Sequence, residues 1–195
     1  MEENKKIRIG IDLDDVVFDF VPTFLEFYNE KYGKTILFDE IYTFNLPILL
    51  GISLEETLDL IKSMILNKKM PLVFKSQESI MQLAQKYEIF FITSRIVRET
   101  TIGDLNNLFS GIKFELIFSS NTYANSPGKT KGEIGKENKI EFIVEDSQDY
   151  ALECADKGIK VFLLDKPWNK NCNKHENITC VRNWDEILEK IEERT

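Results

Sequence analysis

Short apolar segments recur along the chain and alternate with amphipathic ones. Six of them have the length and composition of β-strands, and they are residues 7–13, 88–93, 114–119, 140–144, 160–164 and 178–181. Several, such as EIFFIT and KVFLL, are continuous apolar runs without alternating polar positions. Continuous runs are typical of strands that are buried on both faces of a parallel sheet.

The segments between these strands have the spacing of apolar residues that is typical of helices. We expect helices at residues 77–86, 99–109, 131–137, 149–157 and 184–194. Alternation of strands and helices predicts a doubly wound α/β domain.

The connection between the first and second strands breaks this alternation, because it is much longer than one helix. Residues 16–32 predict a helix that Pro22 either kinks or restarts. Residues 54–66 predict a second helix, with Ser53 as its N-cap and Glu56 completing a capping box. We therefore expect a helical insertion in this connection.

This insertion divides the chain into two predicted domains. The core domain comprises residues 1–17 and 76–195, and the helical cap comprises residues 18–75. The cap follows the carboxyl end of the first strand, where open α/β sheets bind ligands. It is therefore placed to act as a lid over a site.

Composition and charge limit the partners of the chain. It has 195 residues, 43% of them hydrophobic, which is enough for one sizeable core. The formal net charge is −8, and an acidic surface repels nucleic-acid backbones. We therefore exclude duplex DNA or RNA as the main partner. A small phosphorylated metabolite is compatible with this charge, because one local positive site can hold it.

Several features argue for a cytoplasmic location. No stretch approaches the ~20 apolar residues of a membrane-spanning helix, and acidic residues interrupt the short N-terminal apolar run. The cysteines Cys154, Cys172 and Cys180 are odd in number, so we expect free thiols in a reducing compartment. Cys172, His175 and Cys180 offer only three ligands, and a surface loop explains their spacing better than a metal site.

Acidic residues cluster directly after the first apolar strand, in the segment Asp12-Leu13-Asp14-Asp15. Neighbouring carboxylates repel one another, so this cluster is costly unless a cation neutralises it. The alternative is a strand end whose acidic residues only cap the following helix.

A second acidic pair, Glu145-Asp146, follows the apolar run IEFIV. The carboxyl ends of neighbouring parallel strands meet at one edge of a sheet, so Asp12, Asp14 and Asp146 are predicted to converge on one cation. Mg²⁺ suits this oxygen-only set better than Zn²⁺, because no His or Cys lies near either motif. A helix cap is the alternative role of Asp146.

Hydroxyl and basic groups follow the same logic. Thr93, Ser94 and Arg95 come after the strand EIFFIT, and a hydroxyl at a strand end can donate to a phosphate oxygen; a helix N-cap is the alternative. The lysines before the fourth strand are Lys129, Lys131 and Lys136. Lys131 begins a predicted helix, where backbone amides also favour anions. Each lysine alone is also explained as a solvated surface charge.

In this order the motifs resemble the four motifs of the haloacid dehalogenase (HAD) superfamily, over essentially the whole chain. DLDDV matches the first motif and Thr93 the second. Lys131 is the better match to the third, with Lys136 as the fallback, and Glu145-Asp146 matches the acidic fourth. The segments DLDDVVFDF, FFITSR and FIVEDSQDYALECADKGIKVFLLDKPWN are similar to nucleotidases related to 5′(3′)-deoxyribonucleotidases. These nucleotidases usually have two aspartates in the fourth motif, where this chain has Glu145-Asp146.

The resemblance implies a three-layer, Rossmann-like HAD core and a Mg²⁺-dependent phosphatase for a small phosphorylated metabolite, such as a nucleoside monophosphate. Asp12 is then the nucleophile that forms an aspartyl-phosphate, and Asp14 is the general acid and base. The implied metal ligands are Asp12, Asp146 and the backbone carbonyl of Asp14. The implied substrate-binding residues are Thr93, Ser94, Arg95 and Lys131.

Other functions remain to be weighed against a nucleotidase. They are a phosphatase for another metabolite, such as a sugar phosphate, and a non-catalytic ligand-binding domain of the same fold. The complete set of acids, hydroxyl and lysine argues against the non-catalytic domain. Dehalogenase members lack an acid where Asp14 stands, and a two-component receiver domain does not accept so long an insertion.

The sequence leaves substrate identity and oligomeric state open, including a homodimer. Phe18, Phe20, Phe44 and Arg95 are candidate contacts to the leaving group. Packing in a helical core is the alternative for the aromatic residues.

Overall fold

A computed structural model of the chain describes residues 6–120, 128–170 and 175–194. Its centre is a six-stranded sheet in the order β3-β2-β1-β4-β5-β6, and every strand pair is parallel. The strands are β1 (Arg8–Ile11), β2 (Glu88–Thr93), β3 (Phe114–Phe118), β4 (Phe142–Glu145), β5 (Lys160–Leu164) and β6 (Ile178–Val181). The predicted α/β class and its parallel sheet are therefore confirmed.

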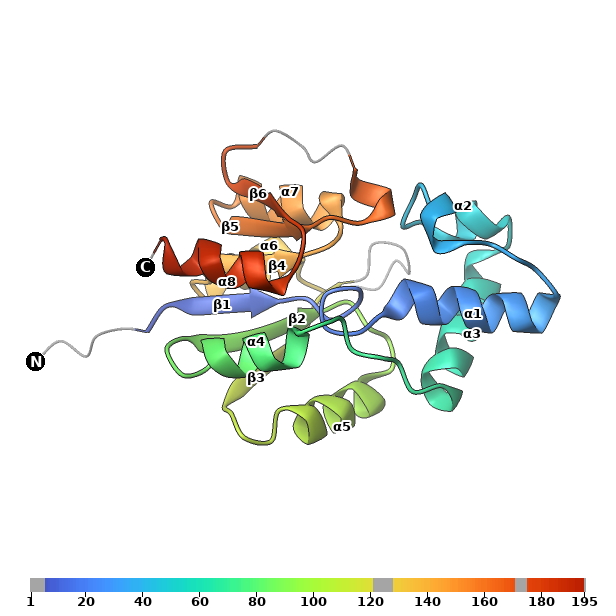
Figure 1. Cartoon of the computed structure of the whole chain (residues 1–195), viewed down its shortest axis with the longest axis horizontal. Coiled ribbons are helices and arrows are strands. Elements are labelled where there is room, and N and C mark those ends of the chain that lie inside the picture. The colour runs from blue at the N-terminus through green and yellow to red at the C-terminus, as the bar shows by residue number, and fades with distance from the viewer. Residues whose placement is uncertain (1–5, 121–127, 171–174, 195) are drawn as a thin grey trace, which may run out of the picture.

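Helices cover both faces of this sheet and complete a three-layer, Rossmann-like arrangement (Figure 1). On one face lie α4 (Ser76–Leu83), α5 (Arg98–Leu108) and α8 (Trp184–Glu192), and on the other lie α6 (Lys131–Glu137) and α7 (Gln148–Asp156). Side chains at alternate positions of a strand pack into the hydrophobic cores on opposite faces of the sheet. Ile9 and Ile11 belong to the core under the first helices, whereas Phe90 and Ile92 belong to the core under the second.

The connection between β1 and α4 forms further helices, which Figure 1 shows beyond the end toward which β1 points. They are α1 (Phe20–Tyr32), η1 (Phe38–Glu40), α2 (Leu46–Leu50) and α3 (Leu54–Asn67). We call residues 18–75 the inserted segment; its role as a separate cap stays a prediction. At the start of α3 the Ser53 hydroxyl accepts from the Glu56 amide at 3.1 Å, as expected. The Glu56 carboxylate accepts from the Tyr32 hydroxyl at 2.9 Å, and the reciprocal bond of a capping box is not formed.

The start of α1 corrects the sequence prediction, which placed a helix from residue 16. Residues 13–18 form a tight turn instead, in which the amides of Val17 and Phe18 donate to the Leu13 carbonyl at 2.8 and 2.9 Å. Asp15 adopts a left-handed φ of 57°, and its carboxylate accepts from the Val21 amide at 3.1 Å. Asp15 thus satisfies an amide of the first turn of α1.

The chain leaves the core at the start of the inserted segment and returns to it at the end, through two stretches of chain that run side by side. The outgoing connection is residues 13–19 and the return connection is residues 68–75. Phe18 and Leu72 form an antiparallel bridge. The Asp19 amide donates to the Pro71 carbonyl at 2.9 Å, and the Val73 amide donates to the Val17 carbonyl, also at 2.9 Å. The two connections are therefore bonded to each other.

The cysteines differ from the prediction of three free thiols. Cys154 is free and buried, whereas Cys180 is disulfide-bonded, so the prediction is wrong at Cys180. An odd number of cysteines leaves at least one thiol unpaired, but it still permits one disulfide. Cys172 lies outside the described residues. No helix in the described part of the chain combines the length and apolar character needed to span a membrane.

Candidate active site

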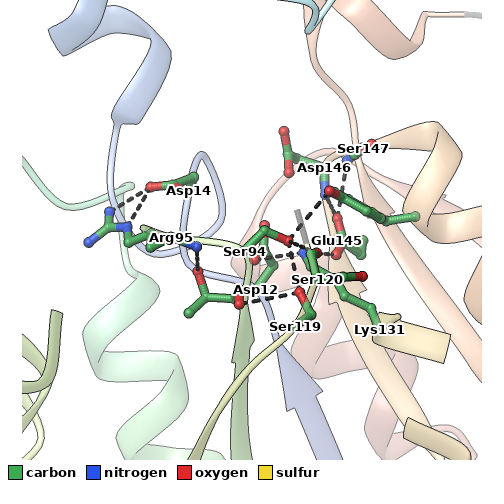
Figure 2. A network of polar contacts seen from close by, with 12 residues as sticks. Asp12, Asp14, Ser94, Arg95, Ser119, Ser120, Lys131, Glu145, Asp146 and Ser147 are labelled. Atoms are coloured by element: carbon green, nitrogen blue, oxygen red, sulfur yellow. Dashed lines mark hydrogen bonds and ion pairs between the residues drawn. The ribbon is translucent and has the colours of Figure 1, made fainter. Parts of the chain in front are cut away.

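Four side chains from different elements converge at the carboxyl edge of the sheet (Figure 2). Asp12 follows β1, Glu145 ends β4, Asp146 follows it, and Lys131 begins α6. One carboxylate oxygen each from Asp12, Glu145 and Asp146 lies within 4.8 Å of the others, and we call these three residues the acidic cluster. The Lys131 ammonium lies 2.8 Å from Asp12 Oδ1 and also contacts Glu145 Oε1. Strand order reverses between β1 and β4, which is where open α/β sheets bind ligands.

Local structure fixes each of these groups. Parallel pairing continues past β1, because the Asp12 amide donates to the Val144 carbonyl at 3.0 Å. The end of β1 is thereby held against β4. Thr130 caps α6 in a capping box with Glu133, so the helix begins at Lys131. The Lys131 side chain is 1% exposed, and its ammonium lies 4.5 Å from the centroid of the Tyr150 ring.

The cluster carries more negative charge than its single ammonium neutralises. Burial raises the pKa of Asp12, and the Asp14 carboxylate raises it further, against the lowering effect of Lys131. Burial raises the pKa of Glu145 to about 7. Burial and the Glu145 carboxylate hold the pKa of Asp146 well above its usual value. Burial alone lowers the pKa of Lys131, but the two carboxylates it contacts raise it well above its usual value.

This donor set fits a hard divalent cation. Buried carboxylates without enough counter-charge favour a cation with oxygen ligands, and Mg²⁺ is such an ion. The Glu145 carboxylate already accepts from the Lys131 ammonium and from the amides of Asp146 and Ser147 at 3.2 and 3.3 Å. The carboxylates of Asp12 and Asp146 accept fewer hydrogen bonds within the described residues, so their oxygens are more available to a cation.

Asp14 and Arg95 form a second ion pair beside the cluster (Figure 2). Arg95 Nε and Nη2 donate to Asp14 Oδ1 at 2.8 and 2.6 Å. The Asp14 side chain is 19% exposed, and its carboxylate does not belong to the acidic cluster. Its expected contact with the metal was through its backbone carbonyl, and that contact stays a prediction.

The other predicted groups also lie near the cluster. Thr93 is fully buried, and its hydroxyl oxygen accepts from the Arg95 amide at 3.2 Å, which leaves the hydroxyl proton to be donated elsewhere. Ser94 Oγ lies 2.8 Å from Ser119 Oγ. Lys136 is exposed and Lys129 pairs with Glu137, so Lys131 alone of these lysines contacts the acidic cluster. Phe18 and Phe20 are buried in the hydrophobic core.

Further neighbours of the site lie after other strands of the sheet. Trp168 Nε1 donates to Asp146 Oδ2 at 3.1 Å, and Asn169 Nδ2 donates to the Asp146 carbonyl at 2.7 Å. Both lie in η2 (Pro167–Asn169), which follows β5. Ser119 directly follows β3. Trp168 and Asn169 belong to the segment DKPWN, which follows a predicted strand at the same edge of the sheet, although the sequence does not determine the direction of the Trp168 side chain. The sequence analysis missed Ser119, which the rule that strand ends share one edge could have indicated, and Tyr150, which no sequence signal marked.

Aromatic side chains from the inserted segment reach the site through Trp168. The ring centroids of Phe38 and Trp168 are 5.8 Å apart in an edge-on arrangement, and those of Phe44 and Trp168 are 5.7 Å apart. We call these three residues the aromatic cluster. Within this cluster, Trp168 donates to Asp146, whereas Phe38 and Phe44 belong to the inserted segment.

Comparison with known proteins agrees with this architecture. No family model matches the chain. "Putative nucleotidase YqfW" of Bacillus subtilis is 27% identical over 190 residues, which are 94% of this chain and 92% of that protein. A nucleotidase of Clostridium acetobutylicum is 25% identical over 186 residues, which are 94% of this chain and 92% of that protein.

Solved structures show the same fold at lower identity. A predicted phosphatase from Clostridium acetobutylicum superposes with a TM-score of 0.69 at 13% identity, covering 96% of this chain and 99% of that one. The HAD-hydrolase YfnB of Bacillus subtilis, bound to magnesium, gives a TM-score of 0.62 at 14% identity, covering 97% and 100%. The resemblance drawn from the motifs is confirmed: the chain has the fold of the HAD-superfamily hydrolases and is similar over nearly its whole length to proteins named as nucleotidases.

Proposed function

We propose that the chain is a Mg²⁺-dependent phosphatase that hydrolyses nucleoside monophosphates through an aspartyl-phosphate on Asp12. The observation that carries this proposal is the contact of the buried Lys131 ammonium with Asp12 at 2.8 Å, inside a buried cluster of carboxylates. Phosphoryl transfer requires a positioned nucleophile and positive charge around the phosphoryl oxygens. Asp12 and Lys131 supply these two requirements at one place.

The chain's own residues account for both halves of the reaction. An Asp12 oxygen attacks phosphorus, the bond to the leaving oxygen breaks, and Asp14 gives its proton to that oxygen. Asp14 then takes a proton from water. The water oxygen attacks phosphorus, the bond to Asp12 breaks, and inorganic phosphate leaves.

The remaining polar groups stabilise charge during both steps. Lys131 neutralises the nucleophile and the phosphoryl oxygens. The Thr93 hydroxyl accepts from the Arg95 amide, so its proton is available to a phosphoryl oxygen. Asp12 and Asp146 would hold Mg²⁺, which when bound supplies further positive charge to the phosphoryl group.

Two observations favour a nucleotide over another phosphorylated metabolite. Relatives that match nearly the whole chain are named as nucleotidases. The aromatic cluster lies next to Asp146, and aromatic rings offer faces on which a base can stack. The predicted cytoplasmic location is kept as part of this proposal.

Phosphate release tests the proposal directly. Wild type is assayed on nucleoside monophosphates and sugar phosphates, with Mg²⁺ and with EDTA. We expect turnover only with Mg²⁺, and we expect Asp12→Asn to lower kcat by at least about 10³-fold, because the nucleophile is lost. Asp156→Asn is the matched control, since Asp156 is an exposed residue at the end of α7 that pairs only with His175 in the described chain. Its activity should equal that of wild type.

Each failure has a separate meaning. No turnover of any phosphomonoester by wild type would refute the phosphatase function. Activity retained by Asp12→Asn would refute the nucleophile. If wild type preferred sugar phosphates, the nucleotidase function would be refuted and the function of a phosphatase for another metabolite would be supported. Intact-mass analysis of acid-quenched enzyme should detect a phosphoryl adduct in wild type and not in Asp12→Asn.

A further inference from the structure

Arg95 pairs with the carboxylate of Asp14 (Figure 2). Its Nε and Nη2 both donate to Oδ1, at 2.8 and 2.6 Å, so two bonds from a planar group converge on one oxygen. This arrangement restricts rotation of the carboxylate and leaves Oδ2 outside the pair. The Arg95 side chain is 1% exposed and that of Asp14 is 19% exposed. The arginine is therefore buried, while solvent can reach the carboxylate it holds.

The same guanidinium touches both connections of the inserted segment. Its central carbon lies 4.5 Å from the centroid of the Phe18 ring, on the outgoing connection. Its Nη2 lies 3.7 Å from the Met70 sulfur, on the return connection. Phe18 is also bridged to Leu72, so the two connections form one unit at this point. The guanidinium therefore contacts Asp14 on one side and this unit on the other.

Stability alone does not explain a charged residue at this place. Arg95 Nη1 is buried, and within the described residues it is the one buried side-chain nitrogen or oxygen that lacks a hydrogen-bond partner. Leaving such a donor unpaired is unfavourable, and more so for a charged group. Apolar residues often replace buried ion pairs without loss of stability. A role in the reaction accounts for Arg95 better than a role in folding.

We propose that Arg95 is a positioning residue that orients Asp14 for proton transfer. The inference rests on the proposed phosphatase function. In this arrangement Arg95 acts through Asp14 and not on the substrate, because its guanidinium is buried against Asp14, Phe18 and Met70.

The test compares two substrates that differ in their need for a general acid. The leaving oxygen of a nucleoside monophosphate needs a proton, whereas p-nitrophenyl phosphate loses a stable phenolate without one. We expect Arg95→Met to lower kcat on the nucleoside monophosphate about 10–100-fold, because a misplaced catalytic group costs about that much. We expect KM on the nucleotide to change less than threefold. The ratio kcat/KM includes phosphoryl transfer to Asp12 but not the later attack of water, which both substrates share, so kcat/KM on p-nitrophenyl phosphate should fall much less than kcat/KM on the nucleotide.

Matched variants separate positioning from damage to the fold. Arg98→Met makes the same substitution three positions along the chain, where the arginine is exposed and lies over Phe118, and it should leave kcat unchanged. Arg95→Lys keeps the charge but loses the planar fork, so its kcat should lie between those of wild type and Arg95→Met. In an Asp14→Asn background, Arg95→Met should have no further effect on kcat, because nothing is left to position. Thermal unfolding shows which variants are folded. If Arg95→Met is not folded, the comparison of Arg95→Lys with wild type tests the proposal.

The outcomes distinguish this inference from the proposed function. If wild type hydrolyses neither substrate, the phosphatase function fails and this inference falls with it. If wild type is active but folded Arg95 variants match it, only the inference is refuted. An equal loss of kcat/KM on both substrates would indicate general damage to the site, and a raised KM with unchanged kcat would indicate direct substrate binding. Either result would overturn the positioning role.

Discussion

The close approach of α6 to α7 makes Gly132 the most informative position for a stability test. Gly132 is the second residue of α6, directly after Lys131, and it is buried. Its amide donates to the Glu153 carboxylate at 2.6 Å. A methyl group at this position would lie 2.8 Å from the Glu153 carbonyl oxygen, 0.6 Å inside the 3.4 Å at which ordinary contact begins. That oxygen belongs to the backbone of α7, so no side-chain rotation can relieve the clash.

The size of the effect follows from two opposing contributions. Glycine to alanine within a helix is favourable by roughly 0.5–1 kcal/mol. Forcing a methyl group into a well-packed contact is unfavourable by about 1–3 kcal/mol. We therefore expect Gly132→Ala to lower the free energy of unfolding by about 1–2 kcal/mol, and Tm by about 3–6 °C. Because α6 must shift to accommodate the methyl group, Lys131 moves with it and kcat should fall as well.

Gly103→Ala is the matched control, because Gly103 lies exposed within α5 and an added methyl group would meet nothing within 4 Å. In this variant the free energy of unfolding should rise by roughly 0.5–1 kcal/mol, and the activity should equal that of wild type. Urea unfolding gives the two free energies, and phosphate release gives the two values of kcat. If Gly132→Ala were as stable as Gly103→Ala, the packing of α6 against α7 would not be tight enough to position Lys131, and this reasoning would be refuted.

Two further predictions concern Trp168 and Cys154. Trp168→Phe keeps an aromatic ring but removes the N–H donated to Asp146 Oδ2, and it should weaken Mg²⁺ binding by about tenfold or more, because such hydrogen bonds orient metal ligands. Titration calorimetry measures this affinity. Phe44→Leu leaves that N–H in place and should bind Mg²⁺ like wild type. Equal Mg²⁺ affinities of wild type, Trp168→Phe and Phe44→Leu would contradict the prediction. Burial raises the pKa of the Cys154 thiol, so it should stay protonated at neutral pH and resist iodoacetamide until the protein is unfolded. Peptide mapping that finds Cys154 alkylated equally fast in native and urea-unfolded protein would show that the thiol is accessible.

The core of the fold was predictable because its signals are local. Strands buried on both faces appear as continuous apolar runs, and all six expected strands are present in the sheet. The start of α1 was not predictable, because contacts from distant parts of the chain shape residues 13–18. Trp184 Nε1 donates to the Val16 carbonyl at 3.0 Å, and Leu72 pairs with Phe18. The left-handed backbone of Asp15 carries no sequence signal, since glycine usually occupies such positions.

The candidate site was predictable to the extent that it depends on strand ends. Asp12 and Asp146 follow neighbouring parallel strands, so their meeting follows from topology. The choice of Lys131 over Lys136 depends on which face of α6 is buried, and one short helix does not determine this from sequence. The partners Arg95 and Trp168 depend on side-chain direction in three dimensions. Their pairing with Asp14 and Asp146 was therefore beyond sequence reasoning.

The surroundings of Asp12 and Asp14 explain how two chemically identical residues, two positions apart, can take different roles. Asp12 is buried, bonded to Lys131 and included in the acidic cluster, which suits its proposed role as nucleophile and metal ligand. Asp14 is partly exposed and bonded to Arg95, outside that cluster, which suits its proposed role as general acid and base. The two cations come from different elements, because Lys131 begins α6 and Arg95 follows β2. The proposed roles therefore differ in the cation that each carboxylate contacts, and we expect substitution of Lys131 and substitution of Arg95 to impair different steps of the proposed reaction.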